Sequence, residues 1–178
     1  GAVDADGKTG DGAGIHLEIP PDFFTEKIEL TGHKHDGSEI CVGMIFLPRN
    51  NYAAQENSRT LVESELTKSN FSIYGWRQVP VNPKVLGDKA NLTRPEITQV
   101  LFKHNDETLT GKYLERKIYE SRRKIEKEAI KNAIEGFYIC SLSSKSIIYK
   151  GMFLAESIAD FYTDLKDERF ISRYAIFH

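Results

Sequence analysis

Cysteine, methionine and tryptophan are scarce in this sequence of 178 residues, which holds two, two and one of them. Two cysteines provide neither a disulfide framework nor a four-cysteine metal site. Long apolar runs are also lacking: residues 42–47 form one of the longest, whereas a membrane-spanning helix needs about 20 apolar residues. We therefore expect a cytoplasmic protein that holds no metal and has no membrane partner.

An excess of positive charge is lacking too, because 24 Lys and Arg stand against 26 Asp and Glu. The formal net charge of −2 excludes a bulk positive field that would hold a nucleic-acid backbone. One local exception is residues 112–131, where eight basic and four acidic side chains give a local net charge of +4. Interleaved glutamates favour a solvated helix face there, with RNA binding as the alternative.

Hydrophobic periodicity divides the chain into short elements. Single strands and strand pairs separated by helices are typical of an α+β layered domain rather than of a βαβ repeat. We expect one domain over residues 1–178 and a hairpin in which Ser143, Ser144 and Lys145 join two strands. The expected strands are residues 15–19, 40–47, 71–79, 97–103, 137–142, 146–150 and 171–177, and the expected helices are residues 23–30, 52–68, 109–134 and 153–165.

Two motifs near the start resemble ligand-binding loops but are incomplete. Residues 7–9 read Gly-Lys-Thr, yet Ala2 stands where a phosphate-binding loop needs its first glycine. Residues 4–7 resemble the start of a calcium loop, but the required glutamate would fall on Ile15. We therefore expect neither ligand to bind.

The remaining candidate groups also favour structural roles. His33 and His35 could supply two metal ligands, but no third ligand lies nearby in the sequence, so a solvated turn is favoured. Cys41 and Cys140 each lie in a predicted buried strand, which favours inert thiols, because reactive cysteines need exposure and electropositive neighbours. On chemistry alone, the sequence carries no self-contained active site.

Several longer strings nevertheless carry a resemblance. They are residues 1–15 (GAVDADGKTGDGAGI), 43–48 (GMIFLP), 75–81 (GWRQVPV), 95–100 (PEITQV), 114–119 (LERKIY) and 149–152 (YKGM). In this order they resemble the N-terminal class II glutamine amidotransferase domain of the large subunits of glutamate synthases. The resemblance implies an N-terminal-nucleophile hydrolase-like αββα sandwich that is incomplete at both ends of this chain.

The same resemblance implies a chemistry. In that family a cysteine thiol at the mature N-terminus attacks the side-chain amide of glutamine, with its own α-amino group as base. Glutamate and ammonia result, and the ammonia serves the reductive amination of 2-oxoglutarate by FMN and an iron–sulfur cluster elsewhere in the parent enzyme. Glutamine is thus the implied partner, and we expect no cofactor within these residues.

The family's nucleophilic cysteine would lie before residue 1, so we expect no catalytic residue here and no activity of the fragment alone. Asp11, Gly12, Ala13 and Gly14, called here the glycine-rich segment, resemble a stretch that passes near the nucleophile in related amidotransferases. Small residues there permit close backbone approach. A simple turn into the next strand is an equally good interpretation.

Two further expectations follow from the resemblance and the missing nucleophile. The alternative function is a non-catalytic, amidotransferase-like binding or regulatory module. We also predict an unpaired sheet edge near Ile15 or Ile171, through which the chain could form a homo-oligomer, because exposed edges recruit partners.

Overall fold

The computed structural model describes residues 5–178. Its strands are β1 (Ala13–Glu18), β2 (Cys41–Leu47), β3 (Phe71–Gln78), β4 (Glu96–His104), β5 (Tyr138–Ser143), β6 (Ser146–Gly151) and β7 (Ala175–Phe177). Its helices are α1 (Pro21–Leu30), α2 (Tyr52–Lys68), α3 (Asp88–Thr93), α4 (Gly111–Lys131) and α5 (Ile158–Phe161). Three 3₁₀ turns complete them, namely η1 (Pro83–Val85), η2 (Ala155–Ser157) and η3 (Thr163–Lys166).

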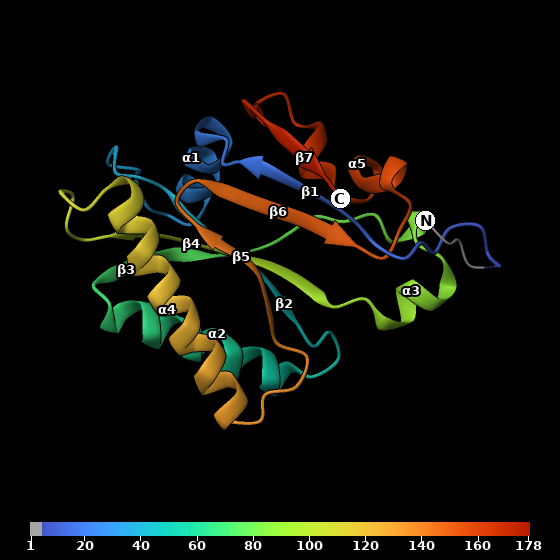
Figure 1. Ribbon diagram of the computed structural model, residues 1–178, viewed down its shortest axis with the longest axis horizontal. Helices are drawn as coiled ribbons and strands as arrows, with labels where there is room; N and C mark the ends of the chain where they lie inside the picture. Colours follow the sequence, from blue (N-terminus) through green and yellow to red (C-terminus); the bar gives the residue numbers. More distant parts are fainter. Residues whose placement is uncertain (1–4) are drawn as a thin grey trace.

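Two antiparallel sheets stack on one another, and helices α2 and α4 cover the four-stranded one (Figure 1). The four-stranded sheet has the order β3-β4-β2-β5, and the three-stranded sheet has the order β6-β1-β7. The layers are therefore helix, sheet and sheet, which confirms the expected α+β class. Strand β2 is internal, as its continuous apolar sequence predicts for a strand buried on both faces.

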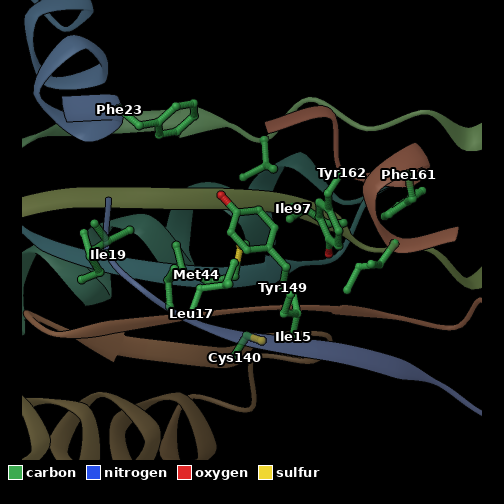
Figure 2. Packing of buried hydrophobic residues seen from close by; sticks show 14 of the residues in the cluster. Ile15, Leu17, Ile19, Phe23, Met44, Ile97, Cys140, Tyr149, Phe161 and Tyr162 are labelled. Atoms are coloured by element: carbon green, nitrogen blue, oxygen red, sulfur yellow. The ribbon is translucent and has the colours of Figure 1, made fainter. Parts of the chain in front are cut away.

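Buried side chains form two cores, one on each face of the four-stranded sheet. The first core lies between the sheets, and Figure 2 shows Leu17, Met44 and Tyr149 within it. The second core lies under α2 and α4 and includes Ile45 and Ile118. Because successive side chains of a strand point to opposite faces, β2 contributes to both cores.

Helix α4 forms because its apolar residues recur at helical spacing. Leu114, Ile118, Ile125 and Ala129 are all buried against the sheet. The charged side chains lie on the other face, in agreement with the sequence expectation. The helix ends at Lys131, and Ala133 beyond it has a φ of 52°.

The predicted hairpin of β5 and β6 is wrong. Strand β5 pairs with β2 and β6 pairs with β1, so the chain passes from one sheet to the other at residues 143–146. The Glu115 carboxylate accepts hydrogen bonds from the Ser144 backbone N–H (2.6 Å) and from the Ser143 hydroxyl (3.0 Å). A side chain of α4 thus holds this turn, and the two strands join different sheets.

The predicted helix over residues 153–165 is also wrong. It is divided into η2, α5 and η3, because Tyr162 adopts an extended conformation and bridges to Val81. This bridge carries the Tyr162 ring into the core between the sheets. A helix of six residues, α3, lies within residues 80–95, where none of the expected strands and helices falls.

The expectations about the last strand and the sheet edges are partly wrong. The last strand is limited to β7, and Ile171 lies outside it with 71% of its surface exposed. Strand β1 lies between β6 and β7, so no free edge exists at Ile15. Among the described strands, β7 is an edge of its sheet.

Candidate functional site

The glycine-rich segment lies where the chain enters β1. Asp11 and Gly12 are exposed, whereas Ala13 and Gly14 are buried and begin the strand. Gly12 has a φ of +123°, a conformation that favours glycine. Ala13 pairs with Gly151, the last residue of β6, so the segment lies at one end of the sandwich.

Gly14 pairs with His178, the residue after β7. Its N–H donates to the His178 carbonyl (2.9 Å), and its own carbonyl accepts from the His178 N–H (3.0 Å). A Cβ atom at position 14 would lie 2.8 Å from the His178 Nε2 atom. A side chain at position 14 would therefore displace the exposed imidazole ring of His178 from its place over the strand.

The turn before the segment is held by Asp6. Its carboxylate accepts hydrogen bonds from the backbone N–H groups of Lys8 and Thr9 (both 2.9 Å) and from the Thr9 hydroxyl (2.8 Å). These bonds, first of all that from the Thr9 N–H, lower the pKa of Asp6. Both backbone N–H groups are therefore bonded within the turn. Residues 1–4, which belong to the two incomplete motifs, lie outside the described part.

The same turn rests on the loop before α3. A Cβ atom at Gly87, the residue that caps α3, would collide with the side chains of Asp6 and Thr9. A Cβ atom at Gly10 would lie 2.8 Å from the Phe153 carbonyl oxygen. Glycines on both sides of the contact thus fix the path of the chain into β1.

An apolar pocket lies beside the segment. Its volume is about 120 Å³, and Gly151, which pairs with Ala13, forms part of its wall. Together with Gly151 it is lined by Phe46, Leu86, Ala90, Thr93, Arg94, Pro95, Ile97, Lys150, Met152, Phe153 and Phe161. The pocket and the glycine-rich segment therefore both contact the end of β6.

A buried polar network lies deeper between the sheets. The Arg77 guanidinium donates to both Asp164 oxygens (2.7 and 2.9 Å) and to Gln99 Oε1 (2.7 Å). The Tyr149 hydroxyl donates to Asp164 Oδ2 (2.9 Å) and accepts from Gln99 Nε2 (3.0 Å). The network joins β3, β4, β6 and η3, so it ties both sheets and the turn after α5 together.

Burial and charge set the protonation of this network. Burial raises the pKa of Tyr149 well above its ordinary value, and the Asp164 charge raises it further. Burial alone would lower the pKa of Arg77, but the bonds to Asp164 raise it more. The network therefore keeps the Arg77 guanidinium charged and the Tyr149 hydroxyl neutral. Sequence reasoning missed it, because no spacing rule links positions 87 residues apart.

The two cysteines are buried, as the sequence predicts, and lie on opposite faces of the four-stranded sheet. Cys41 belongs to the core under the helices, and Cys140 to the core between the sheets. Burial raises the pKa of Cys140 to about 11 and raises that of Cys41 further. Neither thiol is a nucleophile at neutral pH, because the thiolate is the reactive form.

The two histidines of the predicted turn bond to nearby groups. His33 Nδ1 lies 3.0 Å from the Thr31 hydroxyl, and His35 Nε2 lies 2.8 Å from the Ser38 carbonyl. Within residues 5–178, no group of three or more His, Cys, Asp or Glu side chains is placed to hold a metal ion. The helices of the same residues include none that is long and apolar enough to span a bilayer.

The basic charges of α4 are partly paired on the helix itself. Arg122 and Arg123 both contact Glu126, and Lys131 lies 4.0 Å from Glu128. Arg122 also donates to the Ile139 carbonyl (2.9 Å), which links the helix to β5. These contacts are those of a solvated helix face with local ion pairs.

Comparison with known proteins places this geometry in a family. The family model described as "Glutamine amidotransferases class-II" matches residues 1–178. The chain is 52% identical over 178 residues to "Glutamate synthase [NADPH] large chain" of Azospirillum brasilense, and 37% identical to "Ferredoxin-dependent glutamate synthase" of Pyropia yezoensis and to its chloroplastic counterpart of Spinacia oleracea. All of this chain is covered, but only 11–12% of each relative. The chain belongs to the class-II glutamine amidotransferases.

Proposed function

We propose that the chain forms part of the glutamine-hydrolysing domain of a glutamate synthase large chain. The observation that carries the proposal is the 52% identity to such a large chain over all 178 residues. In this function glutamine is hydrolysed to glutamate and ammonia, and the ammonia is used for the reductive amination of 2-oxoglutarate. Glutamine is then the partner that this part of the enzyme serves.

Within that domain, we propose that these residues form the scaffold and one wall of the site. The glycine-rich segment lies at a sandwich end, with Asp11 and Gly12 exposed, so it is accessible to a substrate. The attacking thiol is neither Cys41 nor Cys140, because both are buried and have raised pKa values. The 178 residues alone are therefore expected not to hydrolyse glutamine.

In this proposal the cofactors of the parent enzyme bind outside these 178 residues. Iron–sulfur clusters are held by cysteine thiolates, typically four of them. Cys41 and Cys140 do not fit such a cluster, because they lie on opposite faces of one sheet. We propose that FMN and the cluster are held by other parts of the parent enzyme.

A chimera tests the function. The matching residues of the Azospirillum brasilense large chain are replaced by this chain, and glutamine-dependent release of ammonia is measured. The chimera is expected to retain most of the host's rate, because a shared fold supplies the same scaffold. The control is the same chimera with Cys41→Ser and Cys140→Ser, which is expected to be equally active.

Two results would count against the proposal. A soluble, folded chimera without ammonia release would favour the alternative, a non-catalytic binding or regulatory module. Loss of activity in the cysteine control alone, with an unchanged melting temperature, would show that one of the two thiols takes part in the reaction.

A further inference from the structure

The apolar pocket beside the glycine-rich segment has the form of a small ligand site. Its walls come from five separate parts of the chain: the end of β6 with Gly151, and four parts represented by Phe46 in β2, Ala90 in α3, Ile97 in β4 and Phe161 in α5. Ala90, Ile97 and Phe161 are nearly fully buried, and Figure 2 shows Phe161 on the side of Ile97 and Tyr162. The inner walls therefore belong to the core, while Met152, which is 48% exposed, and Thr93 lie at the surface side of the pocket.

A guanidinium group lies at this apolar wall. Arg94 lines the pocket, and its Nε atom donates to the Asn91 side-chain oxygen (3.2 Å). That bond fixes the side chain and leaves both terminal nitrogens to other partners. Among residues 5–178, no ion pair joins Arg94 to a carboxylate. A carboxylate accepts two parallel hydrogen bonds from such a fork.

The charges around Arg94 favour an anion. Its pKa is lowered, first by burial and then by the neighbouring charge of Arg49, while Glu96 has a smaller opposite effect. Lys150 also lines the pocket, and its Nζ atom lies over the Tyr138 ring and donates to the Tyr138 hydroxyl (2.6 Å). The like charges of Arg94 and Arg49 repel, so an anionic group beside Arg94 relieves that repulsion.

The size of the pocket limits the apolar part of the ligand. An apolar cavity of about 150 Å³ can hold benzene, so a volume of about 120 Å³ fits a tail of roughly four or five carbons. We propose that this pocket binds a small monocarboxylate with a short apolar tail, its carboxylate on Arg94 and its tail against Ala90 and Phe161. Glutamine does not fit this description, because its side chain ends in a polar amide.

The location of the pocket gives such binding a consequence. Gly151 pairs with Ala13, and the Phe153 carbonyl lies against Gly10, so two wall residues contact the chain that leads into β1. A bound tail packs on the same strand end that positions the glycine-rich segment. Binding is therefore expected to restrain this segment, a further role that does not depend on the proposed glutamine chemistry.

Titration of the ¹⁵N-labelled chain with 4-methylpentanoate tests the site by NMR. The expected result is saturable binding with a dissociation constant of about 1 mM. The largest shifts are expected at the amides of Ala90, Arg94 and Gly151, with smaller ones at Gly12. Arg94→Gln is expected to weaken binding at least tenfold, and the matched control Arg123→Gln, on α4 outside the pocket, is expected to leave it unchanged.

Two further probes separate the carboxylate from the tail. Acetate lacks the tail and 4-methylpentanamide lacks the charge, so both are expected to bind at least tenfold more weakly than 4-methylpentanoate. Ala90→Leu fills the pocket and is expected to abolish saturation. Equal binding of the amide or of acetate, full binding to Arg94→Gln, or the absence of saturable shifts in the folded chain would each overturn the proposal.

Discussion

The buried pair of Arg77 and Asp164 offers the sharpest test of how this fold is held together. The side chains of Arg77 and Asp164 are 12% and 4% exposed, and their closest atoms lie 2.7 Å apart. We consider three variants, namely Arg77→Met, Asp164→Leu and the double variant. Each single change leaves one buried charge without its partner, whereas the double change removes both charges.

The magnitude follows from the contacts that each variant loses. Asp164→Leu removes three hydrogen bonds that the carboxylate accepts, two from Arg77 and one from Tyr149. Removing one partner of a buried ion pair typically costs about 3–5 kcal/mol, while replacing both by apolar groups is often close to neutral. We therefore expect each single variant to lose about 3–5 kcal/mol of unfolding free energy, and the double variant to lose less than the sum.

Urea unfolding followed by circular dichroism measures these free energies, and the double-mutant cycle gives the coupling between the two side chains. Additive losses, with a coupling below about 0.5 kcal/mol, would refute the reasoning. Losses below about 1 kcal/mol in both single variants would refute it as well, because that is the range of an exposed salt bridge.

Three further predictions concern a core glycine, the turn between β5 and β6, and a buried thiol. Gly43→Ala is expected to lower the free energy of unfolding in urea by about 1–3 kcal/mol, because the added Cβ would lie 2.6 Å from Leu142 and 2.7 Å from Val100. An unchanged free energy would show that the core under the helices relaxes to accept the methyl group. Glu115→Ala is expected to cost about 1–3 kcal/mol, because the Ser144 N–H loses its acceptor, whereas Glu120→Ala on the same helix changes stability by less than about 0.5 kcal/mol; equal losses would contradict this account of the turn. Burial raises the pKa of Cys140 from 9.0 to about 11, so between these pH values the unfolded chain loses the proton and the folded chain keeps it. Stability is then expected to fall by about 2 kcal/mol from pH 9 to pH 11 relative to Cys140→Ala, and parallel pH profiles of the two proteins would contradict this.

Much of the fold could be predicted because its strongest signals are local. Residues 52–68 are the helix α2 that the periodicity predicts, and β2 is the internal strand that its apolar run predicts. The N-terminal-nucleophile hydrolase type of fold, which the resemblance implies, is confirmed by family membership. For these elements the local sequence pattern and the family resemblance predict the same structure, because local preferences in natural sequences agree with the global fold.

The predicted helix over residues 153–165 and the predicted β5–β6 hairpin are wrong because tertiary contacts override the local pattern there. Residues 153–165 have a helical apolar stripe, but the bridge between Tyr162 and Val81 interrupts it. The link from β5 to β6 has the length of a hairpin turn, yet Glu115 of α4 binds it and the strands join different sheets. Neither partner is near in sequence, so periodicity carries no signal for them.

The candidate site was only partly accessible to sequence reasoning. The glycines of the segment permit close backbone approach, and in the structure Gly14 pairs with His178 at the sheet edge. Arg94 and the pocket beside it gave no signal, because the walls are assembled from strands and helices far apart in the chain. That the glycine-rich segment approaches a substrate stays a prediction.

The central claim is that these residues are a scaffold of a glutamine-hydrolysing domain and do not supply its nucleophile. Ammonia release from glutamine by the purified, folded 178-residue chain tests it most directly. The account predicts a rate at the buffer background, because both thiols are buried and protonated at neutral pH. Release well above background that disappears in Cys41→Ser or Cys140→Ser would contradict it.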